Sequence, residues 1–201
     1  MGYAEMKREV TNAISLIELL LDDMEYSHKL VDKEIEDIKK SYATMNDRLL
    51  EARLQPVLRI MTRTVFAAIE GLCYKTKNLS LHLCDHRGIP VTQTEREDVL
   101  EKTTNKDGKT INHYPETKEN IKQTLNILYR AFGFKFEITE HEKWKKLCMA
   151  IDVRNRITHP KNLAEMEITG TDYRDESEGF EWFTQSWKGV LTLLKKSGNP
   201  I

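Results

Sequence analysis

The chain has 201 residues, of which 31 are lysine or arginine and 32 are aspartate or glutamate, so its formal net charge is −1. This length can bury a real core, in one large domain or in one domain with a helical extension. The balanced charge excludes a bulk basic field, so any nucleic acid would have to be attracted by a local patch.

The cysteines and the hydropathy of the chain indicate in which compartment the protein is expected. Cys73, Cys84 and Cys148 form an odd set without a C-x-x-C pair, which argues against a disulfide framework or a zinc ribbon. No apolar run approaches the roughly 20 residues that a membrane-spanning helix needs. The N-terminus lacks an apolar signal core and a myristoylation site, so we expect a cytoplasmic protein that contacts no membrane.

The first fifty residues read as two helices. Apolar residues recur at spacings of three and four from Val10 to Met24 and again from Val31 to Leu49. The polar stretch from Asp22 to Ser27 interrupts this pattern. We therefore expect residues 1–54 to form an antiparallel helical hairpin that packs on or extends the core, with dimerisation through the hairpin as the alternative.

Pro56 removes a backbone hydrogen-bond donor and disfavours helical geometry at Gln55. A break or kink in the helix is therefore predicted at this position. A third helix follows from about Val57 to Lys77. Glu70 lies in an apolar stretch of this helix, where an unpaired carboxylate would be costly. Either Glu70 has a cationic partner, for which Arg154 is the candidate, or it faces solvent.

The helical spacing of apolar residues ends at residue 78 and resumes after residue 115. The sequence therefore predicts an irregular insertion between core helices over residues 78–115. The turn composition of residues 105–109 favours a short hairpin-like excursion. His82, Cys84 and His86 would share one face of an extended chain, but they lack a clear fourth ligand. We expect ordinary loop residues here and no metal site.

The C-terminal part predicts three further helices. The fourth opens at Pro115 and stops at Gly133, and Thr139 with Glu142 forms a capping box for the fifth. After a polar link from Asn162 to Gly179, a last helix carries an apolar stripe from Phe180 to Leu194. The fold class is therefore all-α, a helical bundle over residues 55–201 with an N-terminal helical hairpin.

The fifth helix ends in a chemically distinctive sequence. Its apolar stripe continues at the same spacing into Arg154 and Asn155, and Pro160 predicts that the helix ends near Thr158. His159 is thereby released from the helix. A permanently charged guanidinium, an amide and an imidazole that titrates near neutral pH can bind and cleave a phosphodiester without metal. Flanking basic residues are candidates for RNA binding, or else simply a solvated helix face: Lys145, Lys146, Arg156 and Lys161.

Arg-Asn-x-x-x-His near the end of a late helix in an all-α chain resembles the HEPN superfamily. The residues that carry the resemblance are Arg154, Asn155 and His159, and Glu70 is similar to an acidic position in many members. The resemblance implies a metal-independent endoribonuclease without cofactor, acting as a homodimer in a toxin–antitoxin or phage-defence setting, with a possible antitoxin or defence-system partner. Lys161 departs from members with tyrosine there, which puts control by adenylylation in doubt.

In this interpretation the three residues divide the chemistry of RNA cleavage. His159 deprotonates the ribose 2′-hydroxyl or protonates the leaving 5′-oxygen, and Arg154 holds the scissile phosphate. Asn155 orients the phosphate or the imidazole. The alternative is a catalytically silent HEPN-like helical module that binds a nucleotide, an RNA or a protein partner, in which Arg154 pairs with Glu70 or caps its helix.

Overall fold

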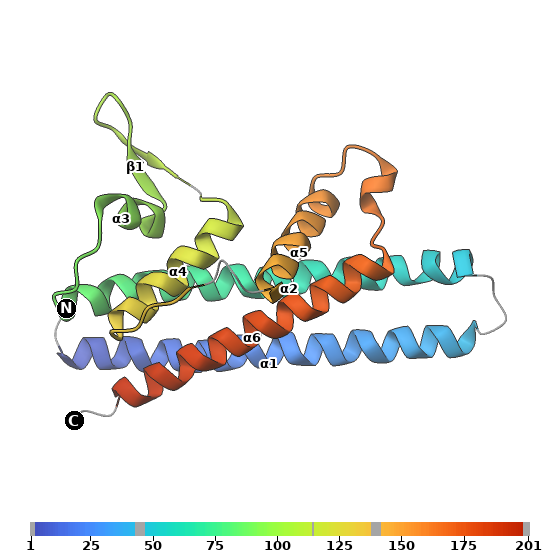
Figure 1. Ribbon diagram of the computed structural model, residues 1–201, viewed down its shortest axis with the longest axis horizontal. Coiled ribbons are helices and arrows are strands. Elements are labelled where there is room, and N and C mark those ends of the chain that lie inside the picture. The colour runs from blue at the N-terminus through green and yellow to red at the C-terminus, as the bar shows by residue number, and fades with distance from the viewer. Residues whose placement is uncertain (1–2, 43–46, 114, 138–141, 199–201) are drawn as a thin grey trace. The chain divides into compact units, whose positions relative to one another are not determined.

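The computed structural model describes residues 3–42, 47–113, 115–137 and 142–198 (Figure 1). These residues are almost entirely helical, with a single two-stranded sheet among them, which confirms the all-α prediction. The elements in chain order are α1 (Tyr3–Ser41), α2 (Asp47–His86), α3 (Gln93–Leu100), β1 (Lys102–Thr104), β2 (Thr110–Asn112), α4 (Thr117–Ala131), α5 (Glu142–Thr158), the 3₁₀ turn η1 (Leu163–Met166) and α6 (Gly170–Gly198).

The chain divides into two compact units, each assembled from separate segments. The hairpin unit comprises Met1–Glu18, Glu70–Glu140 and Gln185–Ile201. The motif unit comprises Leu19–Ile69 and His141–Thr184. Helices α1, α2 and α6 contribute residues to both units.

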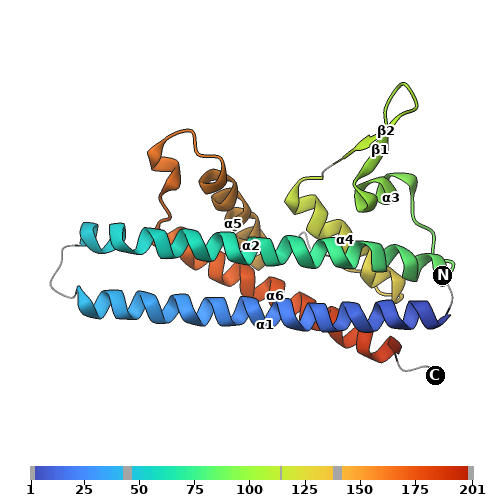
Figure 2. The same cartoon turned by 180° about the vertical axis from the view of Figure 1, so that it is seen from behind.

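The prediction of two helices within the first fifty residues is wrong. One continuous helix, α1, runs through the stretch from Asp22 to Ser27, and the next helix, α2, begins at Asp47. In the motif unit the two long helices run antiparallel (Figure 2). Asp22 and Asp23 are exposed while Leu21 and Met24 beside them are buried, so the carboxylates lie on the outer face of the helix and do not break it.

Pro56 lies inside α2, so the predicted break is wrong. The proline ring is exposed, and neighbouring Leu58 is buried in the core of the motif unit. Packing of this kind can hold a helix together across the one backbone hydrogen bond that proline removes. The missing bond is the one that the carbonyl of Ala52 would otherwise accept.

One buried cluster of the motif unit joins α1, α2, α5 and the segment just before α6. Its buried side chains are Ile35, Leu58, Val153, Ile157 and Ile168. α5 and α6 cross closely because Gly179 has no side chain: a Cβ atom there would lie 2.7 Å from the Cα atom of Leu147. This close crossing holds the first half of α5 against α6.

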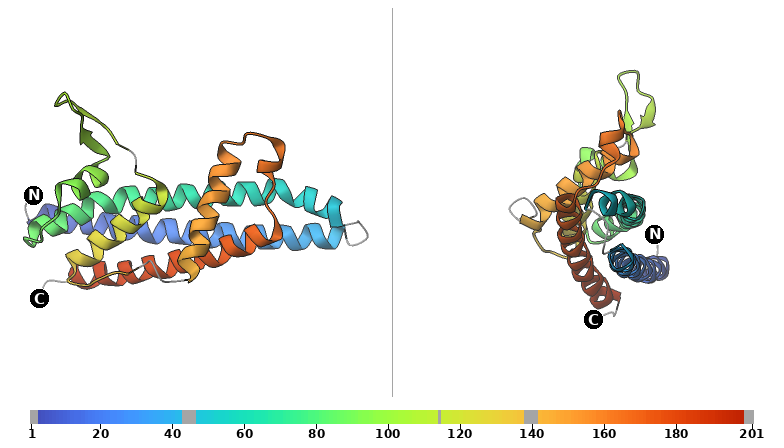
Figure 3. Two further views of the ribbon diagram at one scale, coloured as in Figure 1. Left: turned by 45° about the horizontal axis from the view of Figure 1, so that its top comes forward. Right: turned by 90° about the vertical axis from the view of Figure 1, so that its right-hand side faces the viewer.

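The hairpin unit contains the short sheet. β1 and β2 pair antiparallel with Thr103 opposite Ile111, which confirms the hairpin-like excursion (Figure 3). The amide oxygen of Asn105 accepts bonds from the backbone N–H groups of Asp107 and Lys109 and so shapes the turn. Residues 78–115 are more helical than predicted, because α2 continues beyond Lys77 to His86 with a further buried face and α3 spans Gln93–Leu100.

Replacing Gly179 with alanine should lower the free energy of unfolding by about 1–3 kcal/mol, because the new methyl group meets helix backbone that cannot move aside. Urea denaturation followed by circular dichroism measures this change. Gly170→Ala is the matched control, since nothing lies within 4 Å of a Cβ atom at that position. Equal stability of the two variants would contradict the close crossing.

Candidate functional site

The motif lies where α5 ends in the motif unit. α5 finishes at Thr158, as the proline after His159 predicts. The backbone N–H of His159 donates to the carbonyl of Asn155 at 3.0 Å, which is the last bond of helical type. The side chains of Asn155 and His159 are both exposed to solvent. The imidazole is therefore available to an external molecule.

Arg154 is half-buried and held in a defined direction. Its Nη1 atom donates to the amide oxygen of Asn155 at 2.9 Å, and its Cζ atom lies 6.0 Å from the centre of the Phe66 ring. Phe66 is itself fixed by an edge-on contact with Phe180, with ring centres 5.5 Å apart. A guanidinium placed over an aromatic face keeps its charge while its orientation is restricted.

Side chains of α2 hold the backbone that follows the motif. Arg63 donates to the carbonyl of Ile157 at 3.0 Å, and the amide of Gln55 bonds both the N–H and the carbonyl of Ile168, at 2.8 and 2.9 Å. Arg59 donates to the carbonyl of Met166 at 3.3 Å. Arg63 thus caps the end of α5.

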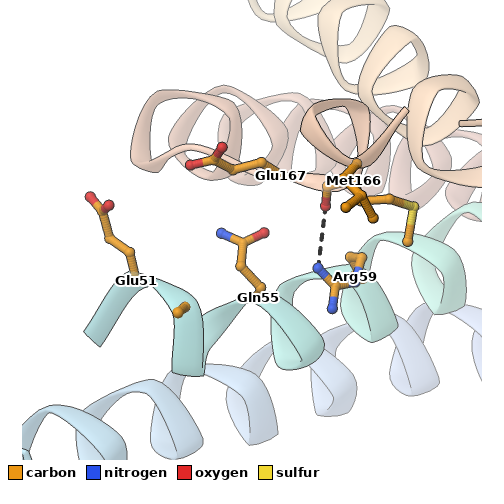
Figure 4. A pocket seen from close by; sticks show the side chains of 7 residues that line it. Glu51, Gln55, Arg59, Met166 and Glu167 are labelled. Atoms are coloured by element: carbon orange, nitrogen blue, oxygen red, sulfur yellow. Dashed lines mark hydrogen bonds between the residues drawn. The ribbon is translucent and has the colours of Figure 1, made fainter. Parts of the chain in front are cut away.

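A groove of about 440 Å³ lies between α2 and this segment (Figure 4). Arg154 and His159 do not line it. Figure 4 shows Glu51 and Glu167 at one end and Arg59 with Met166 at the other. The groove is lined by Glu51, Ala52, Gln55, Arg59, Leu163, Met166 and Glu167.

Arg156, a candidate for RNA binding, is occupied inside the protein. Its Nη2 atom lies 3.0 Å from the carboxylate of Asp172, and its Nη1 atom donates to the carbonyls of Glu165 and Glu167. Asp172 in turn forms a reciprocal cap with Thr169 at the start of α6. These bonds give Arg156 a structural role that its position in the sequence does not reveal.

The other candidates for RNA binding differ in whether a carboxylate of the protein pairs with their positive charge. Lys145 pairs with Glu142 at 2.6 Å, and Lys146 bonds Glu178 and Asp175, which together raise the pKa of Lys146. Lys161 is exposed, and its bonded group is the backbone N–H, which donates to Glu165. The predicted basic patch is therefore largely matched by carboxylates, with Lys161 as the exposed cation next to the motif.

Glu70, the supporting residue, belongs to the hairpin unit, whereas Arg154 belongs to the motif unit. Within its own unit Glu70 is half-buried and lines a cavity of about 290 Å³ together with Tyr74, Glu101, Pro115, Thr117 and Asn120. Its pairing with Arg154 stays a prediction.

The His82, Cys84 and His86 triplet lies on α2 and not on an extended chain, so these residues do not share one face. Cys84 is buried while both histidines are exposed. Across the residues that the structure describes, no group of three or more potential ligands can hold a metal ion. The capping box at Thr139 lies outside the described residues.

Glu176 is the residue near the motif that the sequence analysis missed. Its carboxyl group is completely buried, although the Thr62 hydroxyl lies beside it on α2. Burial raises the pKa of Glu176 to about 8. The hydrogen bond with Thr62 lowers this pKa, and the negative charge of Asp172 raises it by a smaller amount. The sequence pattern places this residue in a polar link, but α6 begins at Gly170. The spacing from Tyr173 to Glu176 and Phe180 is the signal that predicts a helix here.

Arg156→Met should lower the free energy of unfolding by about 1–3 kcal/mol, because Asp172 and two backbone carbonyls lose their donor. Lys161→Met is the control and should change stability by less than about 0.5 kcal/mol, since that side chain is exposed. Denaturation with urea compares the two. If the Arg156 variant is as stable as the wild-type protein, Arg156 has no structural role and is again a candidate for RNA binding.

Glu176→Gln should stabilise the protein, and more so as the pH rises. The carboxyl pKa is raised from 4.5 to about 8 in the folded state, so ionisation of the unfolded chain destabilises the native state progressively from pH 4.5 to pH 8. At pH 7 the gain from removing this group is up to about 3 kcal/mol. Urea denaturation of both proteins at pH 5, 7 and 8 measures the difference; parallel pH profiles would contradict the burial of a titrating carboxyl.

Among the residues that the structure describes, no helix is long and apolar enough to cross a membrane. The chain matches no protein-family model, no curated protein and no solved structure, so the resemblance to the HEPN superfamily stays a prediction from the motif residues.

Proposed function

We propose that this protein is a metal-independent endoribonuclease of HEPN type. The observation that carries the proposal is the arrangement at the end of α5: Arg154 is oriented by Phe66 and Asn155, while His159 is exposed directly after the helix stops. A fixed, permanent cation five residues before an accessible imidazole supplies the two kinds of group that phosphodiester cleavage through the 2′-hydroxyl requires.

In the proposed reaction the ribose 2′-oxygen attacks the adjacent phosphorus and the bond to the 5′-oxygen breaks. His159 accepts the proton of the 2′-hydroxyl or delivers one to the 5′-oxygen. Arg154 offsets the negative charge that develops on the phosphorane oxygens. Asn155 keeps the guanidinium in place through its amide oxygen. The products carry a 2′,3′-cyclic phosphate and a 5′-hydroxyl.

A second copy of the chain fits this chemistry. A single imidazole that has just accepted the proton of the 2′-hydroxyl must deliver it to the far side of the phosphorus. A homodimer that brings two motifs into one cleft divides the base and acid roles between two histidines. We place such a dimer in the cytoplasm, in a toxin–antitoxin or phage-defence role with a protein partner that controls it.

The second candidate is a silent helical module that binds a nucleotide, an RNA or a protein. Ion pairing of the cations around the motif favours this alternative. Lys145, Lys146 and Arg156 each contact a carboxylate, so fewer positive charges are left to attract an RNA backbone. Cleavage activity distinguishes the two candidates directly.

Purified protein should cleave a mixed RNA pool in excess EDTA, leaving cyclic-phosphate ends. His159→Ala and Arg154→Ala should each lower the rate by about 100-fold or more, because each removes a group that acts on the reacting phosphate. His82→Ala and Arg174→Ala are matched controls, since both side chains are exposed outside the motif and should leave the rate unchanged.

Three results would contradict the ribonuclease proposal and favour the binding module. These are no cleavage of the pool by wild-type protein, cleavage that survives both motif substitutions, and cleavage that EDTA abolishes. Circular dichroism of each variant shows whether a loss of rate reflects unfolding.

A further inference from the structure

The groove between α2 and the segment after the motif has features that the proposed ribonuclease activity does not use. It is open to solvent, holds about 440 Å³ and is formed wholly within the motif unit (Figure 4). Its walls combine two carboxylates, an apolar surface and one arginine. Each of these features restricts what can bind there.

One end of the groove is rich in hydrogen-bond acceptors. Glu51 on α2 and Glu167 after η1 are both exposed, and neither forms an ion pair among the described residues. Ala52 lines the same groove, and its carbonyl lacks its usual helical partner because Pro56 has no N–H group. Acceptors from a backbone carbonyl and two carboxylates match a cationic ligand with several N–H donors.

The apolar part of the groove is unusual for its exposure. Leu163 is 90% exposed, which makes it the most exposed large hydrophobic residue of those described. Met166 lies next to it on η1 and also lines the groove. Apolar side chains displayed at the rim of a polar groove are typical of surfaces that bind other proteins.

We infer that this groove binds an arginine side chain of a partner protein, with apolar residues flanking that arginine in the partner's sequence. The guanidinium lies between Glu51 and Glu167, and its planar set of donors also reaches the carbonyl of Ala52. The flanking apolar residues cover Leu163 and Met166. An RNA strand fits less well, because its phosphates would be repelled by the two carboxylates.

This inference does not depend on ribonuclease activity. The groove and the motif have no lining residue in common, so the partner can bind whether or not Arg154 and His159 cleave RNA. The segment Leu163–Glu167 follows His159 closely in the chain, so a bound partner would lie on the backbone that continues from the motif.

The test uses two tripeptides, acetyl-Leu-Arg-Leu-amide and the same peptide with citrulline in place of arginine. Citrulline keeps the shape of the side chain and removes its charge. Each is titrated into the full-length, isotope-labelled protein while the backbone amide signals of residues 163–167 are followed by NMR. The arginine peptide should shift these signals saturably, and the citrulline peptide should bind at least about tenfold more weakly.

Variants locate the binding. The double substitution Glu51→Gln and Glu167→Gln should weaken binding of the arginine peptide at least about tenfold, since it removes both charges and keeps the side-chain size. Leu163→Ala should weaken it about three- to tenfold through lost apolar contact. Glu34→Gln is the control, because that exposed glutamate on α1 does not line the groove.

The inference is overturned by any of four results. These are no saturable shift with the arginine peptide, equal binding of the citrulline peptide, unchanged binding by the double variant, and shifts of the same amides by a short RNA at lower concentration than the peptide needs. The last result would identify the groove as a nucleic-acid site.

Discussion

Three side chains on one face of α2 fix the backbone that follows α5. Gln55, Arg59 and Arg63 are spaced four residues apart, and together they bond backbone groups at Ile157, Met166 and Ile168. A segment that leaves a helix and turns back must satisfy carbonyls that no longer have helical partners. Here long side chains from a neighbouring helix do so. The position of His159 depends on them, because it lies between the first and the second of these anchored points.

The same requirement explains how the cations of the motif unit are distributed. Arg59, Arg63 and Arg156 all donate to main-chain carbonyls, so these three guanidinium groups act as hydrogen-bond donors and not as free charge. Arginine suits this role because its fork reaches two acceptors at once. Arg154 differs from them, since it contacts an aromatic ring and an exposed amide. That contrast distinguishes the motif arginine from its neighbours more clearly than the sequence does.

Sequence reasoning succeeded where a single local constraint decides the structure. Pro160 fixed the end of α5 at Thr158, and the turn residues near Asn105 predicted the hairpin. It failed where packing at a distance overrides local preference. Pro56 does not break α2, and the acidic stretch from Asp22 does not break α1, because neighbouring apolar residues are buried. The start of α6 was missed because Glu176, a buried residue, carries a side chain that normally lies outside.

At the candidate site, too, local features were predictable from the sequence and long-range contacts were not. The sequence predicts the helix end, the exposed histidine and the neighbouring arginine, because these follow from periodicity and one proline. It does not predict that Phe66 orients Arg154 or that Asp172 holds Arg156, because these contacts join residues far apart in the chain. Such partners depend on which helices pack together, and periodicity within one helix carries no information about that choice.

Three helices are each divided between the two compact units without a break, at residues 18–19 in α1, 69–70 in α2 and 184–185 in α6. Neither unit is therefore a single contiguous stretch of the chain. An α-helix turns about 100° with each residue, so inserting one residue at such a point would rotate the buried face on one side relative to the other. The three helices are thus expected to tolerate changes in length at these points far less than a flexible linker would.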